Sequence, residues 1–517
     1  ELRRSKVTDL MTRGFGYDPN SLTTKPLVFP EGSTQIDNAE FKQYSKSFTE
    51  DRFLSVYMTG SYTYNNRYTF FGSLRYDGSN MFGVDRKYKY LPLWAVSGAW
   101  NINREAFLSD ADWLSDLKLR ASYGVQGNVD KDTSPLVVGE WDNTQVLPDN
   151  SESNIIISSP PNQYLRWEKT TNWNGGLDVA VLGNRIAFTA DVYRRVSDDL
   201  IGMRSLPGEN GFDYSTMNWA KLTNRGYELS LSTVNVKTKD FRWVMDFNLA
   251  HNKSKINRLN VRDNSYEPSR EGYSVGAVFS LKTAGLDENG LQMFYNKQGE
   301  KVSFNDFFGL EYGYMMGGLI PFLKSNLSAE EYRNLFTYEG TTEPKFTGGW
   351  INRFYYKNFD LTVSASFVLD QTVQEQPFYN PVQTSPGQNY SRRMSQIWSP
   401  DNTSGKYPRI MGTYTEGEEN WAYQWLGMLD PGNSYRKYDY WFKKMSYMRI
   451  NSIRLGYTFP ERLLGHIGFS SARISFEARN PFVFGSSYKG YFDPETYGNI
   501  YTQPLAKTFS CGIDLTF

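Results

Sequence analysis

Hydrophobic and polar residues alternate one by one along much of this chain. In the stretch 359–369, Leu361, Val363 and Phe367 share one face with other apolar residues, whereas polar residues occupy most of the positions between them. The stretch 67–77 alternates in the same way. Successive side chains of a β-strand point to opposite faces, so this pattern predicts strands with one apolar and one polar face.

The alternation predicts an all-β chain with about thirteen such strands. Many of them run for about ten residues, which is the length that a tilted strand needs to cross a bilayer. The predicted strands begin near residues 53, 67, 91, 117, 172, 185, 224, 241, 346, 359, 448, 472 and 507.

Short and long connections separate these strands in turn. Tight turns are predicted at residues 65–66, 182–184 and 357–358. Outer-membrane β-barrels have short turns on the periplasmic side and long loops on the extracellular side. We therefore predict a transmembrane antiparallel β-barrel with six long extracellular loops. These loops are residues 77–90, 126–171, 197–223, 252–345, 370–447 and 481–506.

The strand directions also predict how the chain enters the barrel. Counted backward from a periplasmic C-terminus, the strand near residue 53 begins outside the cell. Residues 1–52 are then predicted to be an extracellular loop region that leads into the barrel portion, residues 53–517. A single-chain barrel has an even number of strands. An odd count that begins outside the cell therefore predicts an odd number of further strands upstream, without which this chain does not close a barrel.

The size of the barrel decides which face of each strand meets lipid. A barrel much wider than about eight strands cannot fill its interior with side chains. We therefore expect the apolar face to meet lipid and the polar face to line a watery or plugged interior. Tyr62, Tyr64 and Tyr68 gather at one tight turn and residues 354–359 at another, which is typical of an aromatic girdle. The general preference of aromatic residues for strands is the alternative explanation.

Composition excludes several classes of protein. The 56 basic and 56 acidic residues cancel, which argues against a nucleic-acid-binding protein. The sequence contains no apolar run long enough for a transmembrane helix. The 37 Tyr, 34 Phe and 13 Trp suit a membrane interface, and they would also suit a glycan-binding protein. The one cysteine, Cys511, lies on the apolar face of a last strand that alternates up to Phe517, and it excludes a disulfide framework.

Candidate chemistry is sparse. His251 and His466 lie far apart, and the chain has no metal-ligand spacing, catalytic triad or phosphate loop that we would defend. Asp130, Asp132 and Ser134 resemble part of a calcium loop but lack its glycine, so a surface turn explains them better. No enzyme activity, cofactor or metal site is therefore predicted.

One aromatic group in a long loop is the candidate substrate-binding site. Trp421, Tyr423 and Trp425 lie within the loop 370–447. Aromatic rings stack on sugar rings and on peptide side chains. The same three residues could equally pack inside the loop or against a partner protein.

Nine short segments together resemble the SusC/RagA family of TonB-dependent transporters, and they occur in the order that the family has. Each segment alone is weak, and each suits a turn or a strand end, so the motifs indicate architecture rather than chemistry. The sequence departs from the family at Asn480-Pro481, where the family usually has Asn-Leu. The segments are RYDGSNMFG at 75–83, WNINREAFL at 100–108, LKLRASYGVQGN at 117–128, LRWEKT at 165–170, TNRGYE at 223–228, PKFTGG at 344–349, SYMRI at 446–450, LGYTFP at 455–460 and DPE at 493–495.

This resemblance implies a barrel of about 22 strands around a plug. The chain would supply the C-terminal ~13 strands but not the plug domain, with the upstream portion missing or on a separate chain. It also implies a location in the bacterial outer membrane, in contact with outer-membrane lipid. Oligosaccharides or oligopeptides would be imported with a SusD-like surface lipoprotein, driven by TonB-ExbB-ExbD through the missing N-terminal portion. No segment typical of a signal peptide follows residue 1, so we expect a processed, truncated or split chain.

Two other functions fit parts of the pattern. A passive outer-membrane channel would explain a barrel portion without a plug, although porins lack the family segments. A soluble β-rich glycan-binding protein or hydrolase would explain the aromatic content. Extraction only with detergent would exclude the soluble alternative.

Overall fold

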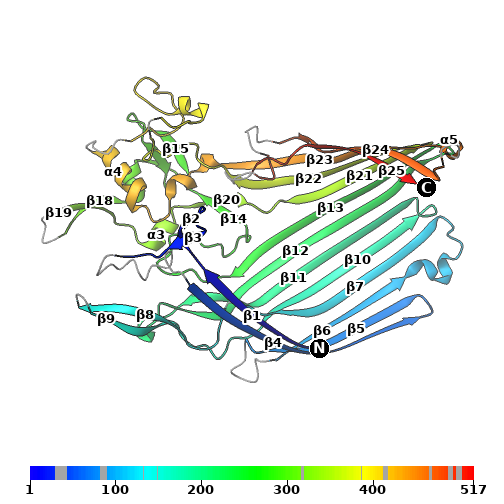
Figure 1. Cartoon of the computed structure of the whole chain (residues 1–517), viewed down its shortest axis with the longest axis horizontal. Helices are drawn as coiled ribbons and strands as arrows, with labels where there is room; N and C mark the ends of the chain where they lie inside the picture. Colours follow the sequence, from blue (N-terminus) through cyan, green and yellow to red (C-terminus); the bar gives the residue numbers. More distant parts are fainter. Residues whose placement is uncertain are drawn as a thin grey trace.

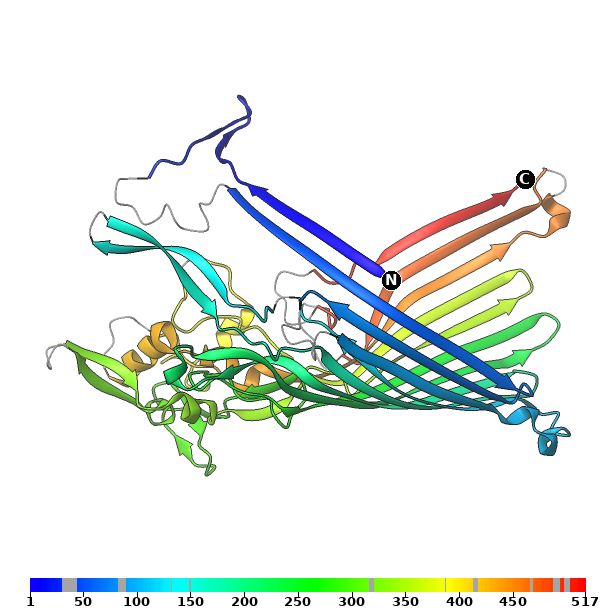
Figure 2. The ribbon, with the colours of Figure 1, turned by 90° about the horizontal axis from the view of Figure 1, so that it is seen from below.

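The main body of the protein is one large, curved antiparallel sheet, shown from two sides in Figures 1 and 2. Within the described residues of this computed structural model, fourteen strands form the sheet, in the order β1-β4-β5-β6-β7-β10-β11-β12-β13-β21-β22-β23-β24-β25. The structure describes residues 1–29, 44–81, 90–131, 133–147, 150–315, 320–385, 387–411, 417–464, 468–486, 493–496 and 503–517.

The strands of the large sheet follow one another along the chain as antiparallel neighbours, which is the topology of an up-and-down barrel wall. Their bounds are β1 Leu2–Thr12, β4 Tyr44–Tyr64, β5 Tyr68–Ser79, β6 Tyr90–Asn101, β7 Leu114–Asn128, β10 Glu168–Val181, β11 Ile186–Ser205, β12 Tyr214–Lys237, β13 Phe241–Arg258, β21 Phe346–Tyr356, β22 Phe359–Gln374, β23 Phe442–Thr458, β24 Ser471–Phe484 and β25 Thr508–Thr516.

The prediction of an all-β antiparallel barrel wall is confirmed, and each predicted strand start lies in, or one residue before, a strand of this sheet. The prediction that residues 1–52 are a loop region is wrong for β1 and for the first part of β4, which pair from Leu2 opposite Leu54 to Thr12 opposite Tyr44. The described strand count is therefore even, and the argument for an odd number of further strands fails. Among the described residues β1 and β25 do not pair with each other, so the sheet is open.

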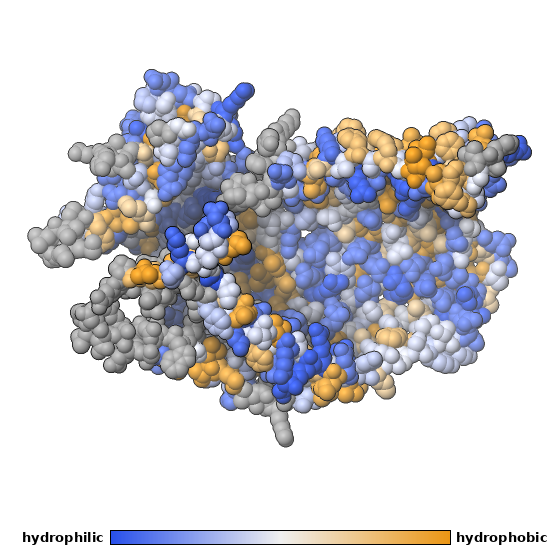
Figure 3. All heavy atoms as spheres, in the orientation of Figure 1, coloured by the Kyte–Doolittle hydropathy of each residue, from blue (hydrophilic) through white to orange (hydrophobic). Residues whose placement is uncertain are grey.

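The two faces of the sheet differ as the alternation predicted. On β22, Val363 and Phe367 lie on one face, and Ser364 lies on the other, where its hydroxyl is 2.7 Å from that of Ser452 on β23. Figure 3 looks onto the concave side, whose centre is mostly hydrophilic. The polar face of each strand therefore lines the hollow of the sheet, and the apolar face lies on its convex side.

Tight turns join the strands at one end of the sheet. Asn65 and Asn66 have positive φ angles of 48° and 56°, and Lys357 has a φ of 50°. Asparagine tolerates this left-handed conformation well, which is why it is favoured in short hairpin turns. The same turns bring the predicted aromatic residues together, except that Tyr355 alternates to the polar face and lies under Arg242.

Long connections at the opposite end fold into small substructures (Figure 2). No helix among the described residues is long and apolar enough to cross a membrane. The small elements at this end are the strands β2 Phe15–Asp18, β3 Thr23–Lys25, β8 Val138–Leu147, β9 Asn150–Ser159, β14 Ala277–Ser280, β15 Thr283–Leu286, β16 Gln292–Tyr295, β17 Lys301–Val302, β18 Leu310–Met315, β19 Ile320–Ser325 and β20 Thr337–Thr341, the α-helices α2 Phe304–Phe308, α3 Ala329–Arg333 and α4 Glu418–Gln424, the π-helix η7 Trp425–Leu429, and the 3₁₀ turns η4 Gly208–Asn210, η6 Arg392–Gln396, η8 Ser434–Lys437 and η9 Asp439–Trp441. The short connections at the turn end hold the helix α5 Glu461–Leu464 and the 3₁₀ turns η2 Ile102–Arg104 and η3 Ala106–Leu108.

The connections β13–β21 and β22–β23 share one hydrophobic core, which we call the loop core. It holds the largest group of buried apolar side chains in the described chain, because the wall itself is a single layer. Its members include Leu281, Leu291, Phe294, Phe304, Phe307, Phe308, Tyr332, Tyr379, Trp425, Tyr435, Tyr438 and Trp441.

Candidate functional site

Charged side chains on the concave face form ion pairs that cross the strands. Arg120 on β7 binds Asp178 on β10 at 2.7 Å and Asp191 on β11 at 3.1 Å. The guanidinium passes over Gly176, where a Cβ atom would lie only 2.6 Å from it. A glycine on the middle strand therefore lets one arginine reach the second strand away.

The same arrangement recurs further along the sheet. Arg473 on β24 pairs with Asp360 on β22 at 2.8 Å, and a Cβ at Gly456 on the intervening strand would meet both side chains. Asp246 on β13 accepts a hydrogen bond from Ser232 at 2.6 Å and pairs with Arg353 on β21. The concave face is thus highly charged, yet many of its charges are matched by partners.

A cavity of about 690 Å³ opens on the concave side near β5. Ser55, Ser73, Arg75 and Asp77 line it, together with Trp167 from the β9–β10 connection. Arg75 binds both carboxylate oxygens of Asp77 at 2.7 Å and reaches Ser55 at 3.0 Å. These polar groups can exchange hydrogen bonds with a polar ligand, so this cavity is the candidate contact site on the wall.

Two family-like segments meet in a buried ion pair that the sequence did not predict. Arg449, in the segment SYMRI, has a side chain that is 2% exposed. Its guanidinium pairs with Asp493 and, at 2.6 Å, with Glu495, and both acids belong to the segment DPE. The pair ties the β24–β25 connection to β23. The co-occurrence of the two segments was the available signal, but their distance in the chain hid the contact.

The family-like segment WNINREAFL lies at the turn end of the wall and binds side chains of the strands there. Glu105 accepts hydrogen bonds from Tyr68 at 2.5 Å and from Trp100 at 2.9 Å, and it pairs with Arg67 at 3.2 Å. One carboxylate thus holds side chains from β5, from β6 and from the turn before β5, so the segment WNINREAFL has an architectural role here.

The aromatic residues predicted to bind substrate lie in and beside the loop core. Trp425 is 3% exposed and lies 5.6 Å from Phe308 between ring centres. Trp421 is partly buried and meets Tyr312 edge-on at 5.1 Å, and Tyr423 packs against the same core. The structure therefore brings the three together and favours the packing alternative for Trp425. Substrate contact by Trp421 and Tyr423 stays a prediction.

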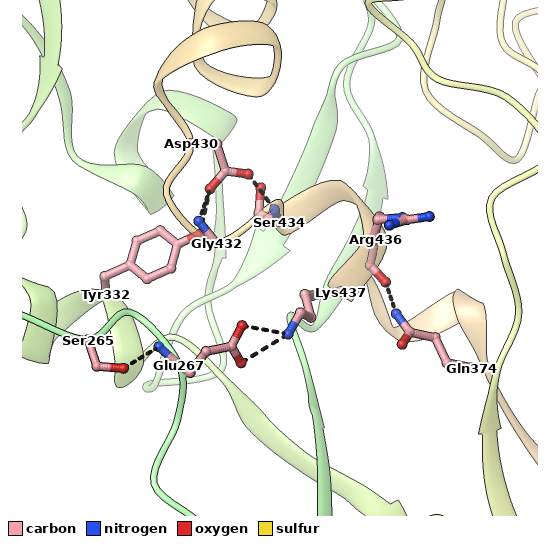
Figure 4. A network of polar contacts seen from close by, with 9 residues as sticks. All are labelled: Ser265, Glu267, Tyr332, Gln374, Asp430, Gly432, Ser434, Arg436 and Lys437. Atoms are coloured by element: carbon pink, nitrogen blue, oxygen red, sulfur yellow. Dashed lines mark hydrogen bonds and ion pairs between the residues drawn. The ribbon is translucent and has the colours of Figure 1, made fainter. Parts of the chain in front are cut away.

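A polar network, shown in Figure 4, joins the two connections that form the loop core. Tyr332 donates a hydrogen bond to Asp430 at 2.7 Å, and the backbone N–H groups of Gly432 and Ser434 also donate to this carboxylate. Burial, followed by the charge of Asp430, raises the pKa of Tyr332 far above its usual range, so its hydroxyl stays a donor. The network holds the β13–β21 and β22–β23 connections in one fixed arrangement.

The described residues hold no group of three or more His, Cys, Asp or Glu side chains suited to a metal ion. Thr133 donates a hydrogen bond to Asp130, which suits a turn. Asp132 and His466 lie outside the described residues. The contacts found on the concave face are hydrogen bonds and ion pairs.

Comparison with known proteins places this wall in a known family of folds. Residues 5–309, more than half of the chain, match a family model described as TonB dependent receptor-like, beta-barrel. The TonB-dependent receptor SusC of Bacteroides thetaiotaomicron is 28% identical over 495 residues, which are 93% of this chain and 45% of that protein. A TonB-dependent receptor of Formosa agariphila is 28% identical over 507 residues, 92% of this chain and 46% of that protein.

Solved structures agree on the fold. The RagAB peptide importer in its open-open state aligns with a TM-score of 0.73 at 21% identity, over 100% of this chain and 52% of that chain. The RagAB peptide transporter aligns with a TM-score of 0.70 at 22% identity, over 93% and 49%. The chain spans about half the length of the curated relatives that it matches.

Proposed function

This chain belongs to the TonB-dependent receptor-like β-barrel family, and from that premise we propose that it forms part of a transporter that imports oligosaccharides or oligopeptides. The family is one of outer-membrane β-barrels, so the chain is an outer-membrane protein and its convex apolar face meets lipid. We take the long connections to be extracellular and the tight turns to be periplasmic, as in other outer-membrane barrels.

One observation carries the proposal: the concave face is a wall of polar and mutually paired charged groups. A polar cargo that moves along such a wall exchanges its hydrogen bonds with water for hydrogen bonds with the protein. Paired charges attract an ionic cargo less strongly than single charges would. The cavity lined by Ser73, Arg75 and Asp77 offers such groups at one place on the path.

The open edges β1 and β25 support a larger assembly. An unpaired strand edge has free N–H and C=O groups, which cost several kcal/mol each in hydrocarbon. We propose that further strands, in a longer chain or a second polypeptide, join these edges and close the barrel. A plug and a segment that contacts TonB-ExbB-ExbD would belong to that portion.

The loop core supports a partner on the extracellular side. It presents a rigid surface, because buried aromatic residues and the network around Asp430 hold two long connections together. We propose that a SusD-like lipoprotein docks there and delivers substrate. The likeness to the RagAB peptide importer supports testing oligopeptides, and oligosaccharides are the second class that the family resemblance of the sequence implies.

Uptake of labelled substrates tests the proposal. Cells that carry the whole protein should take up one class of labelled oligosaccharides or oligopeptides, and deletion of its gene or of TonB should abolish that uptake. Uptake that continues without TonB would instead support the passive channel. Detergent-dependent extraction of the protein should accompany either result.

A matched pair of variants tests the path along the wall. Ser73→Trp places a large side chain in the cavity on the concave face, whereas Leu74→Trp places it on the convex face of the same strand. We expect slower uptake in Ser73→Trp and unchanged uptake in Leu74→Trp. Equal rates in both variants would remove the concave face from the path.

A further inference from the structure

The convex face of β13 changes from apolar to basic along its length. Phe247 and Leu249 lie on this face, and the register with β12 continues without a bulge through His251, Lys253 and Lys255. Lys253 and Lys255 are exposed. Since the loops begin beyond these residues, the basic stretch lies where the apolar band of the wall ends on the loop side.

Three cations stand directly opposite one another across three strands. Arg194 on β11 pairs in register with Arg225 on β12, and Arg225 pairs in register with Lys253 on β13. All three are exposed, and none is ion-paired with a carboxylate among the described residues. Like charges directly opposite each other destabilise a sheet. This row, which we call the basic row, therefore lacks a counter-charge.

The basic row forms one wall of a cavity of about 1030 Å³. β20 and residues 343–345 cover it, and Lys255, Lys345 and Lys444 add further cations to its lining. Acidic groups in the lining are partly engaged elsewhere. Glu339 binds Lys282 at 2.6 Å, and Glu343 accepts a hydrogen bond from Ser254 at 2.7 Å; Asp370 also lines the cavity. The cavity is thus rich in cations and large enough for a sizeable anionic group.

Aromatic residues adjoin the basic row on the side of the apolar band. Tyr227 and Phe346 each lie 5.2 Å from His251 between ring centres, and Tyr227 pairs with His251 on the apolar side of the row. Trp173 stands in the row itself, directly opposite Arg194. Rings with one apolar and one wet side mark the boundary between hydrocarbon and headgroups. The cations beyond them are therefore at the height of lipid headgroups.

We propose that this cavity binds the phosphate-bearing headgroup of an outer-leaflet glycolipid. The basic row supplies the charge, the aromatic residues hold the start of the acyl region, and the segment over the cavity covers the headgroup. The site lies on the face opposite to the proposed substrate path, so its ligand is not the cargo. The inference rests on the proposed orientation but not on transport itself.

The test uses the whole protein with its native partner chains, purified in mild detergent. Binding of lipid A, of the same glycolipid without its phosphates, and of inorganic phosphate is measured by native mass spectrometry. Lipid A should bind, and the dephosphorylated form should bind at least tenfold more weakly. Inorganic phosphate alone should not compete at millimolar concentration, because the acyl region and the aromatic boundary contribute to binding.

Charge-neutral variants assign the site. Each cation near a membrane surface contributes about 1 kcal/mol to binding, or about fivefold in affinity. Arg194→Gln, Arg225→Gln and Lys253→Gln combined should therefore weaken lipid A binding by about a hundredfold. Arg195→Gln, one residue along β11 on the concave face, is the matched control and should change it little.

Several results would overturn the proposal. They are equal binding of the two glycolipids, full competition by inorganic phosphate, and an equal loss in the Arg195→Gln control. Arg225→Gln alone, at the centre of the row, should still weaken binding about fivefold if the triple variant fails to assemble. If the unaltered protein supports uptake of neither substrate class but still binds lipid A, the proposed function is contradicted and this site stands.

Discussion

The buried ion pair of Arg449 gives the sharpest test of how the wall holds its loops. Arg449→Met keeps most of the side-chain volume but leaves Asp493 and Glu495 without their cation. Removing one partner of a buried pair costs about 3–5 kcal/mol. The side chain of Asp493 is 8% exposed and that of Glu495 is 36% exposed, so water can solvate the carboxylate of Glu495 but not that of Asp493. We therefore expect a loss near the lower end, about 3 kcal/mol.

The companion variants separate charge from shape. Asp493→Asn keeps an acceptor for Arg449 but removes its charge, and it should cost about 1–2 kcal/mol. The double variant Arg449→Met with Asp493→Asn should cost less than the sum of the two, because no unpaired buried charge remains at Asp493. Urea unfolding of the purified protein measures all three, and limited proteolysis reports whether residues 481–506 detach. A loss below about 1 kcal/mol for Arg449→Met, or strict additivity, would refute the reasoning.

Three other predictions follow from the wall. Val363→Arg should destabilise the protein by about 2–4 kcal/mol in unfolding experiments if it lies near the bilayer midplane, and Ser364→Arg, on the concave face, should cost clearly less; equal costs would contradict the assignment of faces. An epitope tag at Asn358 should be hidden in intact cells and a tag at Glu418 should be accessible, so surface labelling at Asn358 would reverse the orientation. Gly226→Ala should cost about 1–3 kcal/mol, because its Cβ would press against a backbone carbonyl oxygen of β13; unchanged stability would show that the two strands separate easily.

The sequence predicted the wall well because each strand there has two chemically different faces. β1 was not predicted, because its two faces do not differ in this way. In Leu2–Thr12 one face carries Leu2, Arg4 and Lys6, and the other carries Arg3 and Val7, so neither face is apolar. Its place in the sheet comes from backbone pairing with β4, which no side-chain pattern reveals.

The contacts at the candidate site were harder to predict, because they join residues that are far apart in sequence. The segments SYMRI and DPE were noticed separately, but only the fold brings Arg449 to Asp493. For the loop aromatics, sequence alone left both stacking on a substrate and packing open and favoured packing. Trp425 is buried against Phe308, which lies more than a hundred residues earlier in the chain. The periodicity of a sequence does not reveal such a contact.

The placement of charge links these observations to function. On the concave face, Arg120 and Arg473 each reach an acid two strands away, and a glycine on the strand between makes room for each crossing. Such pairs tie three strands together and also limit the net charge that a passing solute meets. On the convex face of β11–β13, the basic row has no such partners among the residues that the structure describes. Paired charges on the concave face suit a path along which different polar cargoes pass. Unpaired cations at the end of the apolar band on the convex face suit a lasting contact with an anionic surface.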